Sequence, residues 1–156
     1  VQMDVSSAIP AELAAEAELV FGHAAPLRRA QMARQALDGA RVLWVDDHPE
    51  NNVWERRLLN AFGVDVTTAE STRSALALLS DSTFDLILSD IARGSVSDDG
   101  LAALPTIRDA AAATPIIFYV GQGNRSSETP AGAFGITKNP GELLHLVLDV
   151  LERTRV

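Results

Sequence analysis

The sequence predicts an α/β protein in which a doubly wound sheet of five parallel strands is flanked by helices. From residue 41 onward, short apolar segments alternate with amphipathic ones, and Gly, Pro or Ser separates them. The apolar segments are continuous, which is typical of strands that are buried on both faces. Parallel strands need crossover connections, and these place helices on both sides of the sheet. We therefore expect one such domain over residues 40–156, after a helical extension or linker over residues 1–39.

Composition limits the classes of function. The chain has 156 residues, of which 47% are hydrophobic, enough for one sizeable core. Its net charge of -8 argues against direct binding of nucleic acid. The absence of Cys excludes disulfides and thiolate metal sites, and it is compatible with a reducing, cytoplasmic location. No apolar run approaches the ~20 residues that span a bilayer, so we expect no membrane segment.

Residues 1–39 are rich in Ala and predict two helices. Pro10 is compatible with the first turn of a helix that continues to about residue 22. A second helix is expected from Pro26 to Asp38, with Gly39 as its stop signal. These helices could be a linker, an arm packed on the domain, or the contact of a homodimer. The residues that could form a contact stripe are Leu27, Met32 and Leu37.

The elements of the main domain follow from apolar periodicity and turn residues. Strands are predicted over Val42–Val45, Val64–Thr68, Phe84–Ser89, Ile116–Val120 and Gly135–Thr137. Helices are predicted over Glu50–Phe62, Ser71–Ser80, Leu101–Ala112 and Gly141–Arg153. Ser71 is a plausible N-cap. Because Gly, Ser, Asn and Pro fill residues 121–131, we expect the helix between the last two strands to be short or irregular.

Charged side chains follow three of the predicted strands. Asp46 and Asp47 come after the first strand, Asp90 after the third, and Lys138 after the fifth. Ligands of open α/β sheets bind beyond the carboxyl ends of the strands, so we expect these residues to share one pocket. Clustered carboxylates repel one another unless a cation neutralises them, and Mg²⁺ prefers such oxygen ligands. An acidic pocket with a lysine is typical of phosphoryl transfer to a carboxylate.

With the segments around them, these residues resemble the receiver domain of response regulators in two-component signalling. The resemblance covers about residues 40–153 and implies a flavodoxin-like sheet of strand order 2-1-3-4-5. The segments that carry it are 42–47, 66–69, 74–79, 84–90, 99–101, 115–117 and 132–138.

The resemblance implies a role for each residue of the pocket. Asp90 would accept a phosphoryl group from a histidine kinase or phosphotransfer protein. Asp46, Asp47, Asp90 and the backbone carbonyl of Ala92 would hold Mg²⁺, and Lys138 would contact the phosphoryl oxygens. The protein would be a signalling domain rather than an enzyme, limited to self-phosphorylation from a donor and autodephosphorylation. Its downstream protein partner is not indicated by the sequence.

Two positions depart from the family pattern and leave an alternative open. Val120 stands where the family has Thr or Ser, and Gly135 stands where it has the aromatic residue that switches position on phosphorylation. Phe134 is adjacent, but neighbouring strand residues face opposite sides, so we expect it only to pack. The alternative is a protein-interaction module with a receiver fold that binds its partner regardless of phosphorylation. The segment 93–98 is longer than in the family and is interpreted as a lid or a tolerated insertion.

Two further interpretations have weaker support. A phosphotransferase or phosphatase of another α/β family would need a second acid near the nucleophile, but Ile91 and Ala92 follow Asp90. The three histidines lack the spacing of a metal site. His48 directly follows Asp47, so we place it either at the pocket rim or in a surface loop.

Overall fold

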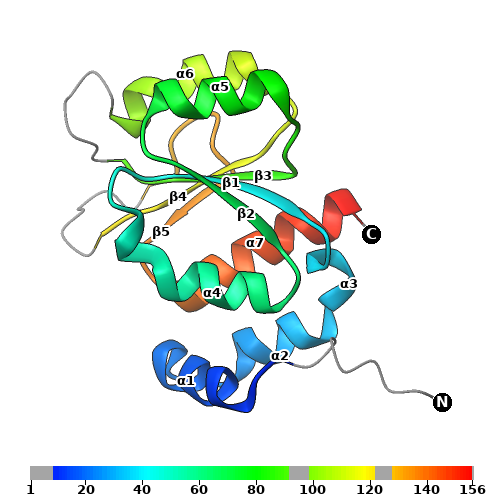
Figure 1. Ribbon diagram of the computed structural model, residues 1–156. Coiled ribbons are helices and arrows are strands. Elements are labelled where there is room, and N and C mark those ends of the chain that lie inside the picture. Colours follow the sequence, from blue (N-terminus) through cyan, green and yellow to red (C-terminus); the bar gives the residue numbers. More distant parts are fainter. Residues whose placement is uncertain (1–8, 92–98, 122–127, 156) are drawn as a thin grey trace.

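A parallel sheet of five strands lies between layers of helices in the computed structural model, which describes residues 9–91, 99–121 and 128–155 (Figure 1). The strand order is β2-β1-β3-β4-β5. The predicted fold class and strand order are therefore confirmed. The strands are β1 (Arg41–Val45), β2 (Asp65–Ala69), β3 (Leu86–Ser89), β4 (Ile116–Tyr119) and β5 (Gly135–Thr137).

Helices cover both faces of the sheet, and one face carries a second helical layer (Figure 1). Helices α5 (Thr72–Asp81) and α6 (Gly100–Ala110) lie on one face. Helices α4 (Val53–Ala61) and α7 (Pro140–Arg155) lie on the other. The N-terminal helices pack outside α4 and α7: they are α1 (Ala11–Phe21), α2 (Ala25–Met32) and α3 (Arg34–Leu37). No helix in the described parts of the chain is both long and apolar enough to cross a membrane.

The central strands explain why both faces must be covered. In β1 the side chains of Val42 and Trp44 join the core under α4 and α7, whereas Leu43 and Val45 join the core under α5 and α6. This alternation is the two-residue period of a strand. All four side chains are buried, so neither face of β1 could be left to water. The continuous apolar pattern of this segment in the sequence therefore results from burial of β1 on both faces, as expected.

Two predicted helices are broken or begin later than expected, whereas the others match their predicted bounds to within two residues. The helix expected over 26–38 is broken at Ala33, whose φ of -104° and ψ of 27° are not helical. The helix expected from Glu50 begins instead as a 3₁₀ turn, η2 (Pro49–Asn52), before α4. Ser71 caps α5: its Oγ accepts a hydrogen bond from the Ser74 N–H at 3.1 Å. In the connection before β5, the described residues 128–134 contain no helix, and residues 122–127 lie outside the described parts.

The N-terminal helices share the core of the sheet. Leu13, Ala17 and Phe21 of α1 belong to the same buried cluster as Trp44 and residues of α7. Of the predicted contact stripe, Leu27 and Leu37 are buried in this cluster, whereas Met32 is 83% exposed. The three residues therefore do not form one exposed surface.

Ion pairs and hydrogen bonds reinforce this packing. Arg29 of α2 donates to Asp149 of α7 at 2.7 Å. In the opposite direction, Arg155 at the end of α7 donates to the carbonyl oxygens of Ala36 at 3.0 Å and Asp38 at 2.7 Å. The N-terminal extension is thus bound to α7 at two places, through α2 near Asp149 and through the end of α3 near Arg155.

We predict that α1 unfolds together with the sheet. Leu13 is 2% exposed and Leu19, on the same helix, is 84% exposed. Leu13→Ala should lower the free energy of unfolding by about 3 kcal/mol, because it removes buried methyl groups and leaves a cavity. Leu19→Ala is the matched control and should change it by no more than about 0.5 kcal/mol. Urea unfolding followed by circular dichroism measures both. A separate early transition in Leu13→Ala, with the main transition unchanged, would show that α1 is an independent unit.

Candidate functional site

The sheet places three carboxylates beside one another at its carboxyl edge. Strands β1 and β3 are neighbours, and Val45 is in register with Ser89, so the next residues, Asp46 and Asp90, lie side by side. The Asp90 N–H donates to the carbonyl of Val45 at 3.0 Å, which fixes the backbone at this point. Asp46, Asp47 and Asp90 can each direct one carboxylate oxygen so that all three oxygens lie within 4.8 Å of one another.

This group of oxygens fits a divalent cation. Three carboxylates at such a separation repel one another unless a cation or a proton intervenes. An all-oxygen set of donors suits a hard cation such as Mg²⁺, which uses one or two carboxylates and keeps several waters. Asp90 is only 9% exposed, which strengthens the repulsion because few waters screen it. Ala92, whose carbonyl was also predicted to be a ligand, lies outside the described residues, as does the segment 93–98.

The start of α6 is built around the backbone of Asp90. Asp99 caps this helix, with its Oδ1 accepting from the Leu101 N–H at 2.7 Å. The Gly100 N–H donates to the carbonyl of Ile91 at 2.6 Å. A Cβ at position 100 would collide with the carbonyl oxygen of Asp90. The Asp-Gly pair therefore lets α6 begin directly against the strand end that carries Asp90.

Lys138 lies at the same edge of the sheet, two strands from Asp90. It directly follows β5, which pairs with β4, and β4 pairs with β3. The Val120 N–H donates to the carbonyl of Thr137 at 3.0 Å, which fixes the end of β4 beside the start of the Lys138 segment. The side chain of Lys138 is exposed at this position.

The two atypical positions lie beside this edge. Val120 is buried in the apolar cluster under α5 and α6, where it can form no hydrogen bond through its side chain. A Cβ added at Gly135 would lie 3.2 Å from the side-chain methyl carbons of Leu146 of α7, so this side chain would have to give way slightly to a larger residue. Phe134 packs against the other cluster, with the Arg153 guanidinium 5.5 Å from its ring centroid. These contacts fit a packing role for Phe134.

A relay of hydrogen bonds from Arg56 through Asn52 holds the Asp46 carboxylate, and sequence reasoning missed it. The Asp46 carboxylate accepts from the His48 N–H at 2.8 Å and from the Asn52 Nδ2 at 3.1 Å. Asn52 is buried, and its Oδ1 accepts from the Arg56 Nε at 2.6 Å. The only sequence signal is the spacing of four between Asn52 and Arg56, which puts both on one helical face.

His48 lies at the rim of the pocket, where its ring is mostly exposed. Its Nε2 is 3.7 Å from an oxygen of Asp47, and its Nδ1 is 3.2 Å from an oxygen of Glu50. The pKa of His48 is raised, first by the negative charge of Asp47 and then by the hydrogen bond with Glu50. The ring therefore responds to the charge of the acidic cluster.

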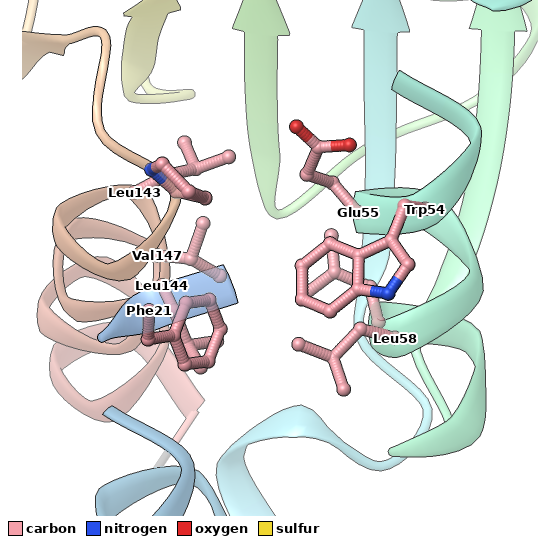
Figure 2. Close-up of a pocket in the computed structure, with 9 residues that line it drawn as sticks. Phe21, Trp54, Glu55, Leu58, Leu143, Leu144 and Val147 are labelled. Atoms are coloured by element: carbon pink, nitrogen blue, oxygen red, sulfur yellow. The ribbon is translucent and has the colours of Figure 1, made fainter. Parts of the chain in front are cut away.

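A second polar contact joins the end of β4 to α4. Tyr119, which precedes Val120, donates its hydroxyl to Glu55 at 2.7 Å. The neighbouring Trp54 meets the ring of Phe21 edge-on, with centroids 5.7 Å apart. Figure 2 shows these α4 side chains facing α7 and Phe21 across a small pocket that is lined almost entirely by apolar groups. The first turn of α4 thus contacts β4 on one side and α1 on the other.

Comparison with known proteins places the chain in context. The family model "Response regulator receiver domain" matches residues 42–139. The receiver domain of a Francisella response regulator is 24% identical, with a TM-score of 0.64 over 75% of this chain and 100% of that chain. TrrA of Thermotoga maritima, solved in complex with Mg²⁺-BeF, is 26% identical, with a TM-score of 0.61 over 71% of this chain and 98% of that chain. CheY4 of Vibrio cholerae, a chemotaxis response regulator, is 28% identical, with a TM-score of 0.54 over 73% of this chain and 97% of that chain. No curated protein matches the chain.

We predict that Tyr119 resists ionisation in the folded protein. Its pKa is raised, first by burial and then by the hydrogen bond to Glu55. The unfolded chain has an ordinary Tyr pKa of about 10, so this contribution to stability is complete below that pH and is lost as the pH rises through the folded pKa. Because the chain has a single Tyr, the ultraviolet absorbance of phenolate reports this residue alone. Absorbance should rise only when the protein unfolds at alkaline pH, and ionisation near pH ~10 in the folded state would contradict the prediction.

Proposed function

Because the chain belongs to the family of response regulator receiver domains, we propose that it accepts a phosphoryl group on Asp90 in the presence of Mg²⁺. The donor would be a histidine kinase or a phosphotransfer protein, through its phosphohistidine. The observation that carries this proposal is the approach of the Asp46, Asp47 and Asp90 oxygens to within 4.8 Å at the carboxyl edge of the sheet. Such a pocket both binds a cation and presents a carboxylate nucleophile.

The chemistry assigns a separate task to each side chain. A carboxylate oxygen of Asp90 attacks phosphorus, the bond from phosphorus to the histidine nitrogen breaks, and that nitrogen keeps the electron pair. When bound, Mg²⁺ supplies positive charge that offsets the charge on the transferring phosphoryl oxygens. Asp46 and Asp47 would hold the cation beside Asp90. Backbone hydrogen bonding and the start of α6 keep Asp90 in place, so little reorganisation accompanies the attack.

Lys138 supports the same reaction from the other side of the edge. Its ammonium group would pair with a phosphoryl oxygen of the incoming donor and of the product. The side chain is long and exposed, and it begins at the carboxyl end of β5. This position lets it reach toward the space above β3 and β4, where the phosphoryl group would lie.

We predict that the protein forms an acyl phosphate in a reaction that needs both Mg²⁺ and Asp90. Incubation with a small acyl-phosphate donor and Mg²⁺ should add about 80 Da, one phosphoryl group, as measured by intact mass spectrometry. Asp90→Asn should abolish the adduct, because an amide is not a nucleophile toward phosphorus. Asp81→Asn, which changes an exposed carboxylate on α5, is the control and should be phosphorylated normally. An adduct that persists in Asp90→Asn would contradict the proposal.

Val120 and Gly135 favour a second candidate function, a partner-binding module that phosphorylation does not switch. Val120 has no hydroxyl for the phosphoryl group, and Gly135 has no side chain to move. A Cβ at position 135 would lie 3.2 Å from the side chain of Leu146, so an aromatic side chain there would require Leu146 to move.

Hydrogen exchange separates the two functions. The phosphoryl mimic beryllofluoride should be added with Mg²⁺, and exchange should be measured in β4, β5 and α7. A switched receiver predicts altered exchange in these elements, beyond the pocket itself. A module that ignores phosphorylation predicts that exchange changes only at the residues that contact the mimic. The control is Asp90→Asn, which should show neither effect.

A further inference from the structure

We propose that Asn52 and Arg56 are positioning residues that hold Asp46 in the orientation needed to bind the divalent cation. This inference rests on the proposed function, because it assigns a task to residues behind one of the proposed metal ligands. Neither residue is expected to touch the cation or the phosphoryl group.

Asn52 is buried between two partly exposed charged groups, Asp46 and Arg56. It ends η2, is 2% exposed, and donates from Nδ2 to the Asp46 Oδ2 at 3.1 Å. Its Oδ1 accepts from the Arg56 Nε at 2.6 Å. Arg56 also donates through Nη2 to the carbonyl of Pro49 at 2.8 Å, which ties α4 to the beginning of η2. Both polar atoms of the buried amide are therefore satisfied, one by an acid and one by a base.

The chemistry of the partners fixes the direction of the relay. An ionised carboxylate only accepts hydrogen bonds, and a guanidinium only donates them. The amide must therefore turn its NH₂ group toward Asp46 and its oxygen toward Arg56. Both bonds involve a charged partner, which makes them stronger than bonds between neutral groups. Reversing the amide would break both bonds at once, so the orientation of Asn52 is well defined.

The relay leaves Asp46 able to bind a cation. Each carboxylate oxygen has two acceptor sites, and the structure uses one on Oδ1 for the His48 N–H and one on Oδ2 for Asn52. A further site on each oxygen remains for a metal ion or its water. Two fixed donors restrict rotation of the carboxylate, so less conformational freedom is lost when the cation binds.

Arg56 also places positive charge behind the acidic cluster. It is separated from Asp46 by the single side-chain amide of Asn52, which is buried, whereas both charged groups are partly exposed. This charge offsets part of the repulsion among the carboxylates from a position behind Asp46.

The test measures Mg²⁺ affinity on the full chain by isothermal titration calorimetry. Asn52→Ala should weaken Mg²⁺ binding about tenfold, the usual effect of removing a hydrogen-bond partner of a metal ligand. Asn51→Ala is the matched control: it changes the neighbouring, exposed Asn of the same 3₁₀ turn, and it should alter the dissociation constant by less than about twofold. Urea unfolding without Mg²⁺ checks that each variant is folded.

A second variant separates positioning from a purely structural role. Arg56→Met keeps much of the aliphatic side chain and removes the donor to Asn52, so it should weaken Mg²⁺ binding. The factor should be smaller than for Asn52→Ala, because the substitution also removes a positive charge that repels the cation. Because the two residues act in series, the double variant should bind no more weakly than Asn52→Ala alone, which is a non-additive result. If Asn52→Ala does not fold, Arg56→Met alone decides the question: unchanged Mg²⁺ affinity would overturn the relay.

The outcomes distinguish this inference from the proposed function. Wild-type affinity in both folded variants, even with reduced stability, would overturn the relay and leave the proposed function intact. Lack of saturable Mg²⁺ binding by the wild-type chain would overturn both. Weakened Mg²⁺ binding in the variants together with an absence of phosphorylation at wild-type Asp90 would support the relay and reject phosphoacceptance.

Discussion

Repulsion among three closely spaced carboxylates is the constraint on which the site depends. The register of β1 and β3 forces Asp46 and Asp90 together, and Asp47 directly follows in the chain. Their oxygens come within 4.8 Å, a separation that favours cation binding over an empty pocket. The protein does not relieve this repulsion by moving the acids apart. It fixes Asp46 from behind, with hydrogen bonds from the His48 N–H and from Asn52.

The same constraint explains why the surrounding elements begin and end where they do. Helix α6 starts at Gly100 against the carbonyl of Asp90, and η2 replaces the first turn of the expected helix so that Asn52 reaches Asp46. In the same turn of α4, Glu55 accepts a hydrogen bond from the Tyr119 hydroxyl. The neighbouring Trp54 packs edge-on against the ring of Phe21 of α1. One short stretch of α4 thus lies between the acidic pocket and the N-terminal layer. Near this stretch, Val120 is buried in the apolar cluster under α5 and α6, and Gly135 lies against the side chain of Leu146.

Much of the fold and the pocket could be predicted because the relevant signals are local. Continuous apolar strands ending in Asp46 or Asp90 indicate a parallel sheet, and the carboxyl ends of such strands share one edge. The relay could not be predicted, since Asn52 and Arg56 look like the polar face of an amphipathic helix until the tertiary structure buries Asn52 beside Asp46. The break at Ala33 could not be predicted either, because Ala favours the helix and nothing local marks an interruption. The apolar stripe of α1 was visible in the sequence, but the surface that it covers depends on α4 and α7, far away in the chain.

The central claim is that the carboxylate at position 90 itself becomes phosphorylated, and chemical mapping tests it most directly. Borohydride reduces an acyl phosphate of aspartate to homoserine, which peptide mass spectrometry locates in the sequence. After treatment with an acyl-phosphate donor and Mg²⁺, we expect homoserine at position 90 and unmodified aspartate at positions 46 and 47. Homoserine at another aspartate, or none in a folded protein that binds Mg²⁺, would contradict the account.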